Sequence, residues 1–136
     1  MIIPNLMVRD LGRSVAFYRD GLGMDLVFAL GPDRQMPEAP EGGVFATLEW
    51  EGAQLMLQTV ESLAQELPVF APGQAPMPGG TVYLRGMEPE PVLARLPAEA
   101  VIRPPFRQWY GMREAYLRDP DGHVICMGVP DGAPPD

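Results

Sequence analysis

Apolar residues in the first half of the chain follow two spacings, one typical of strands and one typical of a helix. Short apolar runs bounded by turn residues predict four strands, at residues 2–8, 24–30, 44–50 and 53–59. Between the first two runs, Leu11, Val15, Tyr18 and Leu22 recur at helical spacing. They predict a helix that begins after Asp10, a good N-capping residue.

Turn and linker signals separate these elements. Glu51-Gly52 predicts a tight hairpin turn, and residues 31–43, with three prolines, predict a loop. Residues 60–67 predict a short helix that Pro68 ends. Residues 68–80 are rich in proline and glycine and are the best candidate for a linker.

The same order of elements then restarts in the second half. Apolar runs predict strands at residues 81–85, 101–106, 112–118 and 124–129, with a short helix at 88–96. The order strand, helix, three strands therefore occurs twice. It predicts an α+β protein built from two βαβββ modules, at about residues 1–59 and 79–129. A chain of 136 residues has the length of a single domain, residues 1–136.

Composition narrows the range of partners and compartments. The formal net charge is −8 and all ten basic residues are arginine, so the chain lacks the basic face that nucleic acid requires. One cysteine excludes an internal disulfide and suits a reducing compartment. No signal peptide and no apolar run of about 18 residues is visible, so we expect a cytoplasmic protein without a membrane span.

Two motifs near the ends of the pattern resemble a known family. "MVRDLGRSVAFYRDGLGM" (residues 7–24) resembles the opening of the glyoxalase/bleomycin resistance/extradiol dioxygenase proteins, the vicinal oxygen chelate superfamily. "QWYGMREAYLRDPDGHVICM" (residues 108–127) resembles the ending of its bleomycin-resistance branch. The resemblance implies paired βαβββ modules that form a curved sheet around a cleft. It also implies a small organic ligand and a homodimer.

The resemblance further implies four inward-facing positions that hold a divalent ion in metal-dependent relatives. Here these positions are Ile3, Met56 (to within one residue), Thr81 and Cys126. Hard or borderline divalent ions prefer imidazole and carboxylate ligands, which none of the four supplies. We therefore expect no metal, no other cofactor and no catalytic residue at these positions, and we interpret Cys126 as a small buried residue in an emptied site.

The only histidine is not expected to supply a metal ligand to this site. His123 lies three residues before Cys126, and an odd separation on a strand places two side chains on opposite faces. The pair is therefore expected neither to share an ion nor to act as a Cys–His nucleophile. We expect His123 simply to follow the Asp-Pro-Asp-Gly turn.

Strand alternation extends the four positions to a list of cleft residues. Asn5 and Met7 share a face with Ile3, and Tyr83 and Arg85 share one with Thr81. An aromatic cluster at residues 106–110 could stack on a flat or cationic ligand. The candidate ligand-binding residues are Met7, Gln54, Met56, Gln58, Thr81, Tyr83, Trp109, Tyr110 and Cys126. The alternatives are that the methionines fill a closed core, and that Trp109 packs in a loop or a dimer contact.

Arg113 matches the arginine of the family motif, and a local ion pair with Asp119 or Asp121 is the simpler interpretation. Three functions remain open at this point. The favoured one is a metal-free binding protein that sequesters a toxic or antibiotic compound, in the manner of antibiotic resistance. The second is a metal-dependent lyase, isomerase or dioxygenase that draws ligands from elsewhere, such as Glu49 or Glu51. The third is a dimeric interaction module with a closed cleft.

Overall fold

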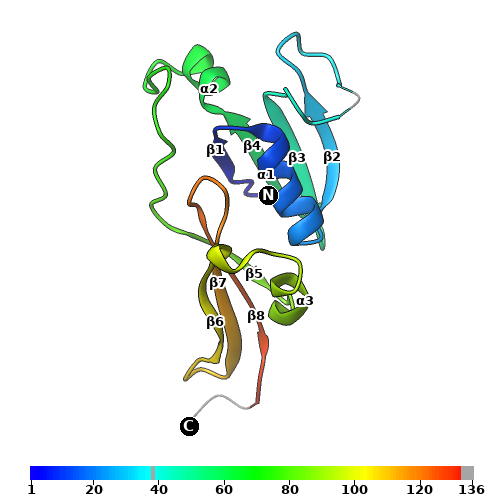
Figure 1. Ribbon diagram of the computed structural model, residues 1–136, viewed down its shortest axis with the longest axis vertical. Helices are drawn as coiled ribbons and strands as arrows, with labels where there is room; N and C mark the ends of the chain where they lie inside the picture. The colour runs from blue at the N-terminus through cyan, green and yellow to red at the C-terminus, as the bar shows by residue number, and fades with distance from the viewer. Residues whose placement is uncertain (38, 133–136) are drawn as a thin grey trace. The chain divides into compact units, whose positions relative to one another are not determined.

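The computed structural model describes residues 1–37 and 39–132. The chain divides into two compact units, which we call the N-terminal unit (residues 1–77) and the C-terminal unit (from residue 78). Each unit contains one four-stranded sheet, and each is described by itself (Figure 1). No helix in the described ranges is long and apolar enough to cross a membrane.

The N-terminal unit is a βαβββ module followed by a short helix. Its elements are β1 (Asn5–Val8), α1 (Leu11–Ala16), the π-helical turn η1 (Phe17–Gly21), β2 (Asp25–Leu30), β3 (Phe45–Trp50), β4 (Ala53–Thr59) and α2 (Val60–Glu66). The strand order is β1-β4-β3-β2, in which β1 runs parallel to β4 and the other neighbours are antiparallel. The predicted strands and helices of this half are confirmed, although β1 begins only after Pro4.

The first helix covers one face of this sheet, as its apolar spacing predicts. The Asp10 side chain accepts a hydrogen bond from the Arg13 N–H and so caps the helix. Leu11 and Val15 are buried, and α1 packs against β3 and β4. Because side chains alternate along a strand, the opposite face of β4 is left for other contacts.

The hairpin between β3 and β4 has the geometry that its sequence predicts. Glu51 and Gly52 both have positive φ, at 49° and 77°. Two central residues with positive φ define a type I′ turn, whose twist matches that of the flanking strands. Trp50 therefore pairs directly with Ala53, and this pairing sets the register of both strands.

The C-terminal unit repeats the module. Its elements are β5 (Thr81–Arg85), α3 (Pro89–Leu93), the 3₁₀ turn η2 (Ala98–Ala100), β6 (Val101–Arg107), β7 (Met112–Arg118) and β8 (Val124–Pro130). The strand order is β5-β8-β7-β6, with β5 parallel to β8. The helix is shorter than predicted and η2 was not predicted. Pro97 disfavours a helical conformation for the residue before it, so the helix ends early.

The two sheets share their strand order and their mixture of parallel and antiparallel pairs. This confirms the predicted α+β fold of two βαβββ modules. In the C-terminal unit, the fully buried Ala115, Leu117, Ile125 and Met127 form the core face of the sheet. Residues 133–136 of the predicted tail lie outside the described residues.

Candidate functional site

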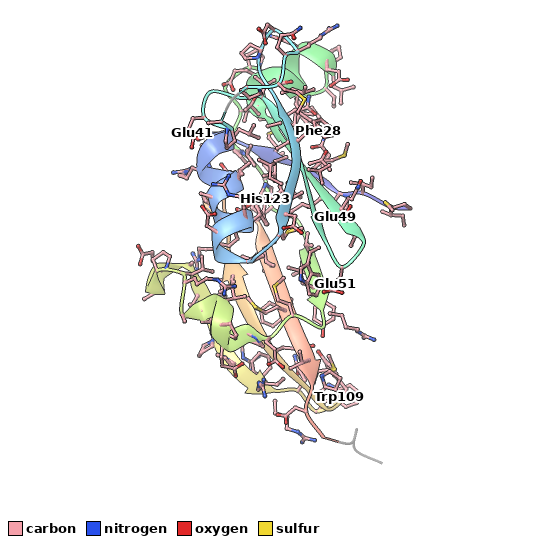
Figure 2. The ribbon with its side chains drawn as sticks, turned by 90° about the vertical axis from the view of Figure 1, so that its right-hand side faces the viewer. Phe28, Glu41, Glu49, Glu51, Trp109 and His123 are labelled. Carbon is pink, nitrogen blue, oxygen red and sulfur yellow. The ribbon has the colours of Figure 1, made fainter. Side chains whose placement is uncertain are left out.

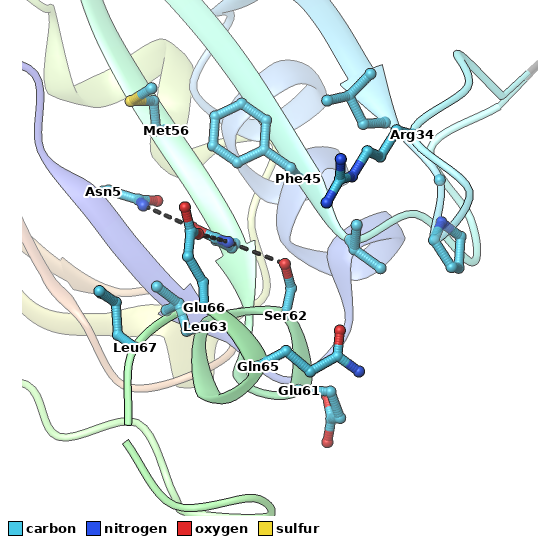
Figure 3. A pocket seen from close by; sticks show the side chains of 15 residues that line it. Asn5, Arg34, Phe45, Met56, Glu61, Ser62, Leu63, Gln65, Glu66 and Leu67 are labelled. Carbon is cyan, nitrogen blue, oxygen red and sulfur yellow. Dashed lines mark hydrogen bonds between the residues drawn. The ribbon is translucent and has the colours of Figure 1, made fainter. Parts of the chain in front are cut away.

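A pocket of about 990 Å³ lies in the N-terminal unit, between the face of the sheet that α1 leaves open and the helix α2 (Figure 3). Phe45 and Met56 contribute an apolar wall from β3 and β4, and Leu63 and Leu67 contribute another from α2 and the residue after it. A pocket of this size and lining is typical of sites for small organic molecules.

The alternation of β4 brings two predicted residues to this pocket. Met56 and Gln58 line it, while Leu55 and Leu57, which alternate with them, are buried. On the neighbouring strand β1, Asn5 stands opposite Met56 and also lines the pocket. Met7, opposite Gln58, and Gln54 lie outside the residues that line the pocket.

Gln58 is the centre of a hydrogen-bonded polar edge. Its Oε1 accepts from Asn5 Nδ2 at 2.9 Å, and its Nε2 donates to Ser62 Oγ at 2.9 Å and to Glu66 Oε2 at 3.1 Å. The amide is thereby fixed in orientation and is buried. The bonds link β1, β4 and α2, so the polar edge is held in place before any ligand arrives (Figure 3).

Arg34 is the one basic residue among those that line the pocket (Figure 3). It lies in a turn where its N–H donates to the Gly31 carbonyl at 3.0 Å, and its φ is 64°. A non-glycine residue in the left-handed region is uncommon. Arg34 belongs to a predicted loop and was not among the predicted site residues, because no local pattern predicts which way a loop residue faces.

In the C-terminal unit, the face opposite the core carries a different cluster, centred on Glu114 of β7. The Glu114 side chain is only 1% exposed. Its Oε1 accepts hydrogen bonds from the hydroxyls of Tyr83, at 2.9 Å, and Tyr110, at 2.6 Å. Cys126 stands between Tyr83 and Tyr116 in the strand register and lies on the same face. We call Glu114, Tyr83 and Tyr110 the carboxyl–phenol cluster.

Both phenols of the cluster, Tyr83 and Tyr110, were among the predicted site residues, but Glu114 was not. Strand alternation offered a signal, since Glu114 and Tyr116 are two residues apart and must share a face. A charged residue on the buried side of a strand is unusual and on its own indicates a special environment. Thr81, also predicted, lies on this face at the exposed start of β5.

The cluster changes the proton affinity of its members. Burial, aided by the hydrogen bond to Glu114, raises the pKa of Tyr83 to about 12. The hydrogen bond to Glu114, followed by burial, raises the pKa of Tyr110 well above its ordinary value. Burial also raises the pKa of the Cys126 thiol to about 11, so this thiol stays protonated and weakly nucleophilic at neutral pH.

Trp109 differs from the other predicted aromatic residues because it is 76% exposed. It lies in the turn between β6 and β7 (Figure 2). Its ring packs edge-to-face on that of Tyr110, with ring centroids 5.4 Å apart. Within the described part of the chain, Trp109 therefore presents most of its surface to solvent.

The expected ion pair of Arg113 needs correction. Arg113 forms ion pairs with Glu88 at 2.8 Å and Glu90 at 3.0 Å, which ties β7 to α3, instead of pairing with Asp119 or Asp121. Residue alternation places Arg113 on the same side of the sheet as α3, and this explains the choice of partners.

His123 belongs to the turn before β8, so the argument from strand alternation does not apply to it. Its backbone N–H donates to Asp119 Oδ1 at 2.8 Å, which closes the turn. This agrees with the simpler expectation that His123 follows the Asp-Pro-Asp-Gly turn.

The residues at the four family metal positions do not fit a divalent ion. Ile3 and Met56 in the N-terminal unit, and Thr81 and Cys126 in the C-terminal unit, offer no imidazole and no carboxylate. The raised pKa of Cys126 works against the thiolate form that binds metal. Among residues 1–37 and 39–132, no three His, Cys, Asp or Glu side chains are grouped to hold an ion.

The alternative ligands Glu49 and Glu51 lie on the β3–β4 hairpin (Figure 2). Glu51 is exposed in the turn, and Glu49 accepts a hydrogen bond from Gln54 at 3.3 Å. Neither belongs to a group of potential metal ligands in the described ranges.

The sequence model of the Glyoxalase/Bleomycin resistance protein/Dioxygenase superfamily matches residues 3–82, more than half of the chain. The chain belongs to this superfamily. No curated protein matches this superfamily member in sequence.

Solved structures similar to this superfamily member extend the likeness over nearly the whole chain. A protein of unknown function from Agrobacterium tumefaciens is 26% identical, covering 95% of this chain and 92% of that chain, with a TM-score of 0.72. A glyoxalase/bleomycin resistance protein/dioxygenase from Nocardioides is 23% identical, covering 100% and 88%, with a TM-score of 0.68. A lactoylglutathione lyase from Agrobacterium tumefaciens is 21% identical, covering 95% and 92%, with a TM-score of 0.65. The last two share the fold and carry no activity over to this chain.

Proposed function

We propose that this superfamily member binds a small organic molecule without a metal ion and sequesters it, as protection against a toxic or antibiotic compound. The observation that carries the proposal is the pocket of about 990 Å³ in the N-terminal unit. Its apolar walls can bury the apolar surface of a ligand. The polar edge around Gln58, already held in place by hydrogen bonds, can fix the orientation of that ligand. The family resemblance supports action as a homodimer, and the single cysteine suits the reducing environment of the cytoplasm.

Binding is favoured over metal-dependent catalysis because of donor chemistry. Lyases, isomerases and dioxygenases of this kind would need an ion to polarise the substrate. Met56 and Cys126 stand at two of the four positions that hold the ion in metal-dependent relatives, and burial makes the Cys126 thiol hold its proton more tightly than an ordinary thiol. A purely structural module is the remaining alternative, and an open pocket in the N-terminal unit argues against it.

The direct test is a thermal-shift screen of planar heterocycles, cationic heterocycles and bleomycin-like glycopeptides. A ligand that binds only the folded state at about 100 times its Kd stabilises the protein by about 2.7 kcal/mol. For a domain of this size the melting temperature should rise by several degrees, about 3 °C or more. Hits are then confirmed by calorimetric titration, which gives Kd and stoichiometry.

A pair of substitutions locates the binding site. Met56→Trp places a larger side chain in the pocket and should abolish binding of a confirmed hit. Met77→Trp makes the same substitution at an exposed position outside the pocket and should leave Kd unchanged. If no compound in the screen shifts the melting temperature, or if both variants bind equally well, the pocket is not the binding site and the proposal fails.

A further inference from the structure

Glu114 occupies an unusual place for a carboxyl group. It lies on an inner strand of the C-terminal sheet, opposite Phe106 of β6 on one side and Gly128 of β8 on the other. A Cβ at Gly128 would fall 2.7 Å from Glu114 Cγ and 2.9 Å from the Tyr83 hydroxyl. The close approach of glycine backbone therefore makes the space in which the carboxyl group and the phenol meet.

The two oxygens of this carboxyl group differ in their hydrogen bonding. Oε1 receives both phenol hydroxyls of the carboxyl–phenol cluster. Oε2 is buried and receives no hydrogen bond from any described residue. Buried polar atoms nearly always have a partner, and an unsatisfied carboxylate oxygen is among the costliest to leave without one.

Three arginines lie near the cluster, and none of them forms an ion pair with Glu114. Arg113 points to the other side of the sheet and pairs with Glu88 and Glu90. Arg103 stacks on Phe106, with its Cζ 3.3 Å from the ring centroid, and Arg85 lies 5.9 Å from the Tyr83 ring centroid. The charge of Glu114 therefore has no cationic partner among the described residues.

The surroundings of Glu114 are aromatic and within reach of solvent. Tyr83 and Tyr110, whose hydroxyls contact the carboxyl group, are each 38% exposed, so the cluster extends from the buried Glu114 to the surface of the C-terminal unit. Tyr116 stacks on Phe106 on the same face, with ring centroids 6.2 Å apart. Aromatic rings attract cations that lie over their faces. A single buried acceptor ringed by aromatic groups is suited to an organic cation that carries an N–H.

We propose that Glu114 is a ligand-binding residue whose Oε2 accepts a hydrogen bond from the protonated amine of an aryl-alkyl ammonium ligand, held beside the rings of Tyr83 and Tyr110. The proposal adds a second ligand-contacting surface to the proposed function. It does not require the pocket of the N-terminal unit to be occupied.

The test uses three small probes that differ only in their head group. Phenethylamine carries a charged N–H donor, phenethyltrimethylammonium carries the charge without a donor, and 2-phenylethanol has no charge. Calorimetric titration of the full chain should show binding of phenethylamine at least about tenfold tighter than binding of the other two, because charge-assisted hydrogen bonds discriminate by this order. Equal affinity for the quaternary probe overturns the proposal. So does the absence of any binding heat for phenethylamine when it is added up to about 50 times the protein concentration.

A substitution then assigns the effect to one oxygen. Glu114→Gln keeps the shape of the side chain and keeps one oxygen that accepts from the phenols. It replaces the other oxygen with an NH₂ donor and removes the negative charge. It should weaken phenethylamine binding on the order of ten- to a hundredfold. Glu99→Gln, an exposed residue of the same unit, changes the net charge equally and should leave affinity unchanged. Unchanged affinity in Glu114→Gln would contradict the proposal.

A further readout guards against misfolding and separates this proposal from the previous one. If Glu114→Gln does not fold, Tyr83→Phe, which frees Oε1 of one donor, must still bind phenethylamine more tightly than 2-phenylethanol; loss of that preference overturns the proposal. Met56→Trp should leave phenethylamine binding unchanged. Loss of amine binding in Met56→Trp would place the probe in the N-terminal pocket, whereas retained amine binding with an inert pocket would defeat only the proposed function.

Discussion

Gly128 stands directly opposite Glu114 in the β7–β8 register, so close that a methyl group on Gly128 would lie 2.7 Å from Glu114 Cγ. This is a steric use of glycine, since the position needs no special backbone angle to explain it. Gly128, which the sequence pattern places simply in the last strand, thus leaves the space that the carboxyl–phenol cluster occupies.

Gly128→Ala should destabilise the protein by about 1–3 kcal/mol, because the added methyl overpacks a site that holds the Glu114–Tyr83 hydrogen bond. Urea unfolding followed by circular dichroism measures the loss. Gly80→Ala is the matched control, because a Cβ there meets nothing within 4 Å, and it should change stability by less than about 0.5 kcal/mol. Equal effects of the two substitutions would show that Gly128 is not tightly packed.

The hairpin turn allows a second test of backbone geometry. Gly52 has a φ of 77°, where an L side chain costs about 1–2 kcal/mol, so Gly52→Ala should destabilise the protein by that amount. Glu51→Asn should cause no loss, because asparagine tolerates positive φ better than glutamate does. Thermal unfolding of the two variants beside wild type provides the measurement. A harmless Gly52→Ala would argue against the type I′ turn.

The fold was predictable because its signals are local. Alternating apolar positions, the capping Asp10 and the Glu51-Gly52 turn each specify an element within a few residues, and the elements repeat in one order. One failure is local in origin and the other depends on tertiary structure. Pro97 shortens α3, and the pairing of Arg113 with Glu88 and Glu90 follows from a helix whose position no spacing reveals.

The sites were only partly predictable because they combine strands with loops. The family resemblance supplied Met56, Thr81 and Cys126, and strand alternation extended this set to Gln58 on one sheet and Tyr83 on the other. Strand alternation could not show that α2 supplies Ser62 and Glu66 to Gln58, nor that Arg34 turns toward the pocket from a loop. Whether any of these residues contacts a ligand stays a prediction.

The phenols should make stability depend on pH at the alkaline end. The folded-state pKa of Tyr83 is about 12, above the ordinary value of 10.0, so the unfolded chain releases this proton first. The stabilising contribution is therefore complete below about pH 10 and is lost as pH rises from 10 toward 12. Tyr110 adds to the same trend, because its pKa is also raised.

Absorbance titration at 295 nm, with unfolding monitored in parallel, tests this trend. Glu114→Gln should shift the ionisation of Tyr83 and Tyr110 to lower pH, since it removes the charge that opposes phenolate formation. Identical titration curves for wild type and Glu114→Gln would show that the cluster does not form.

Cys126 should behave as an inert thiol. It is only 2% exposed, and burial raises its pKa to about 11, so little thiolate is present at pH 8. Labelling with a disulfide reagent should be at least about a hundredfold slower in the native protein than in urea. Rapid labelling of the native protein would instead identify Cys126 as an accessible, activated thiol.

Divalent metal should neither accompany nor stabilise the protein. Ile3, Met56, Thr81 and Cys126 supply donors that zinc, nickel, iron and manganese bind poorly, and the protonated thiol adds a cost to the only sulfur that could ionise. Protein purified without a chelator should contain far less than one metal ion per chain by elemental analysis.

Added zinc or nickel at 100 times the protein concentration should leave the melting temperature unchanged, whereas a site filled at 100 times its Kd would stabilise the protein by about 2.7 kcal/mol. EDTA should likewise have no effect. Stoichiometric metal that survives dialysis, or a melting temperature that falls with EDTA, would show that residues other than these four bind a metal ion. The metal-dependent function would then replace the binding function.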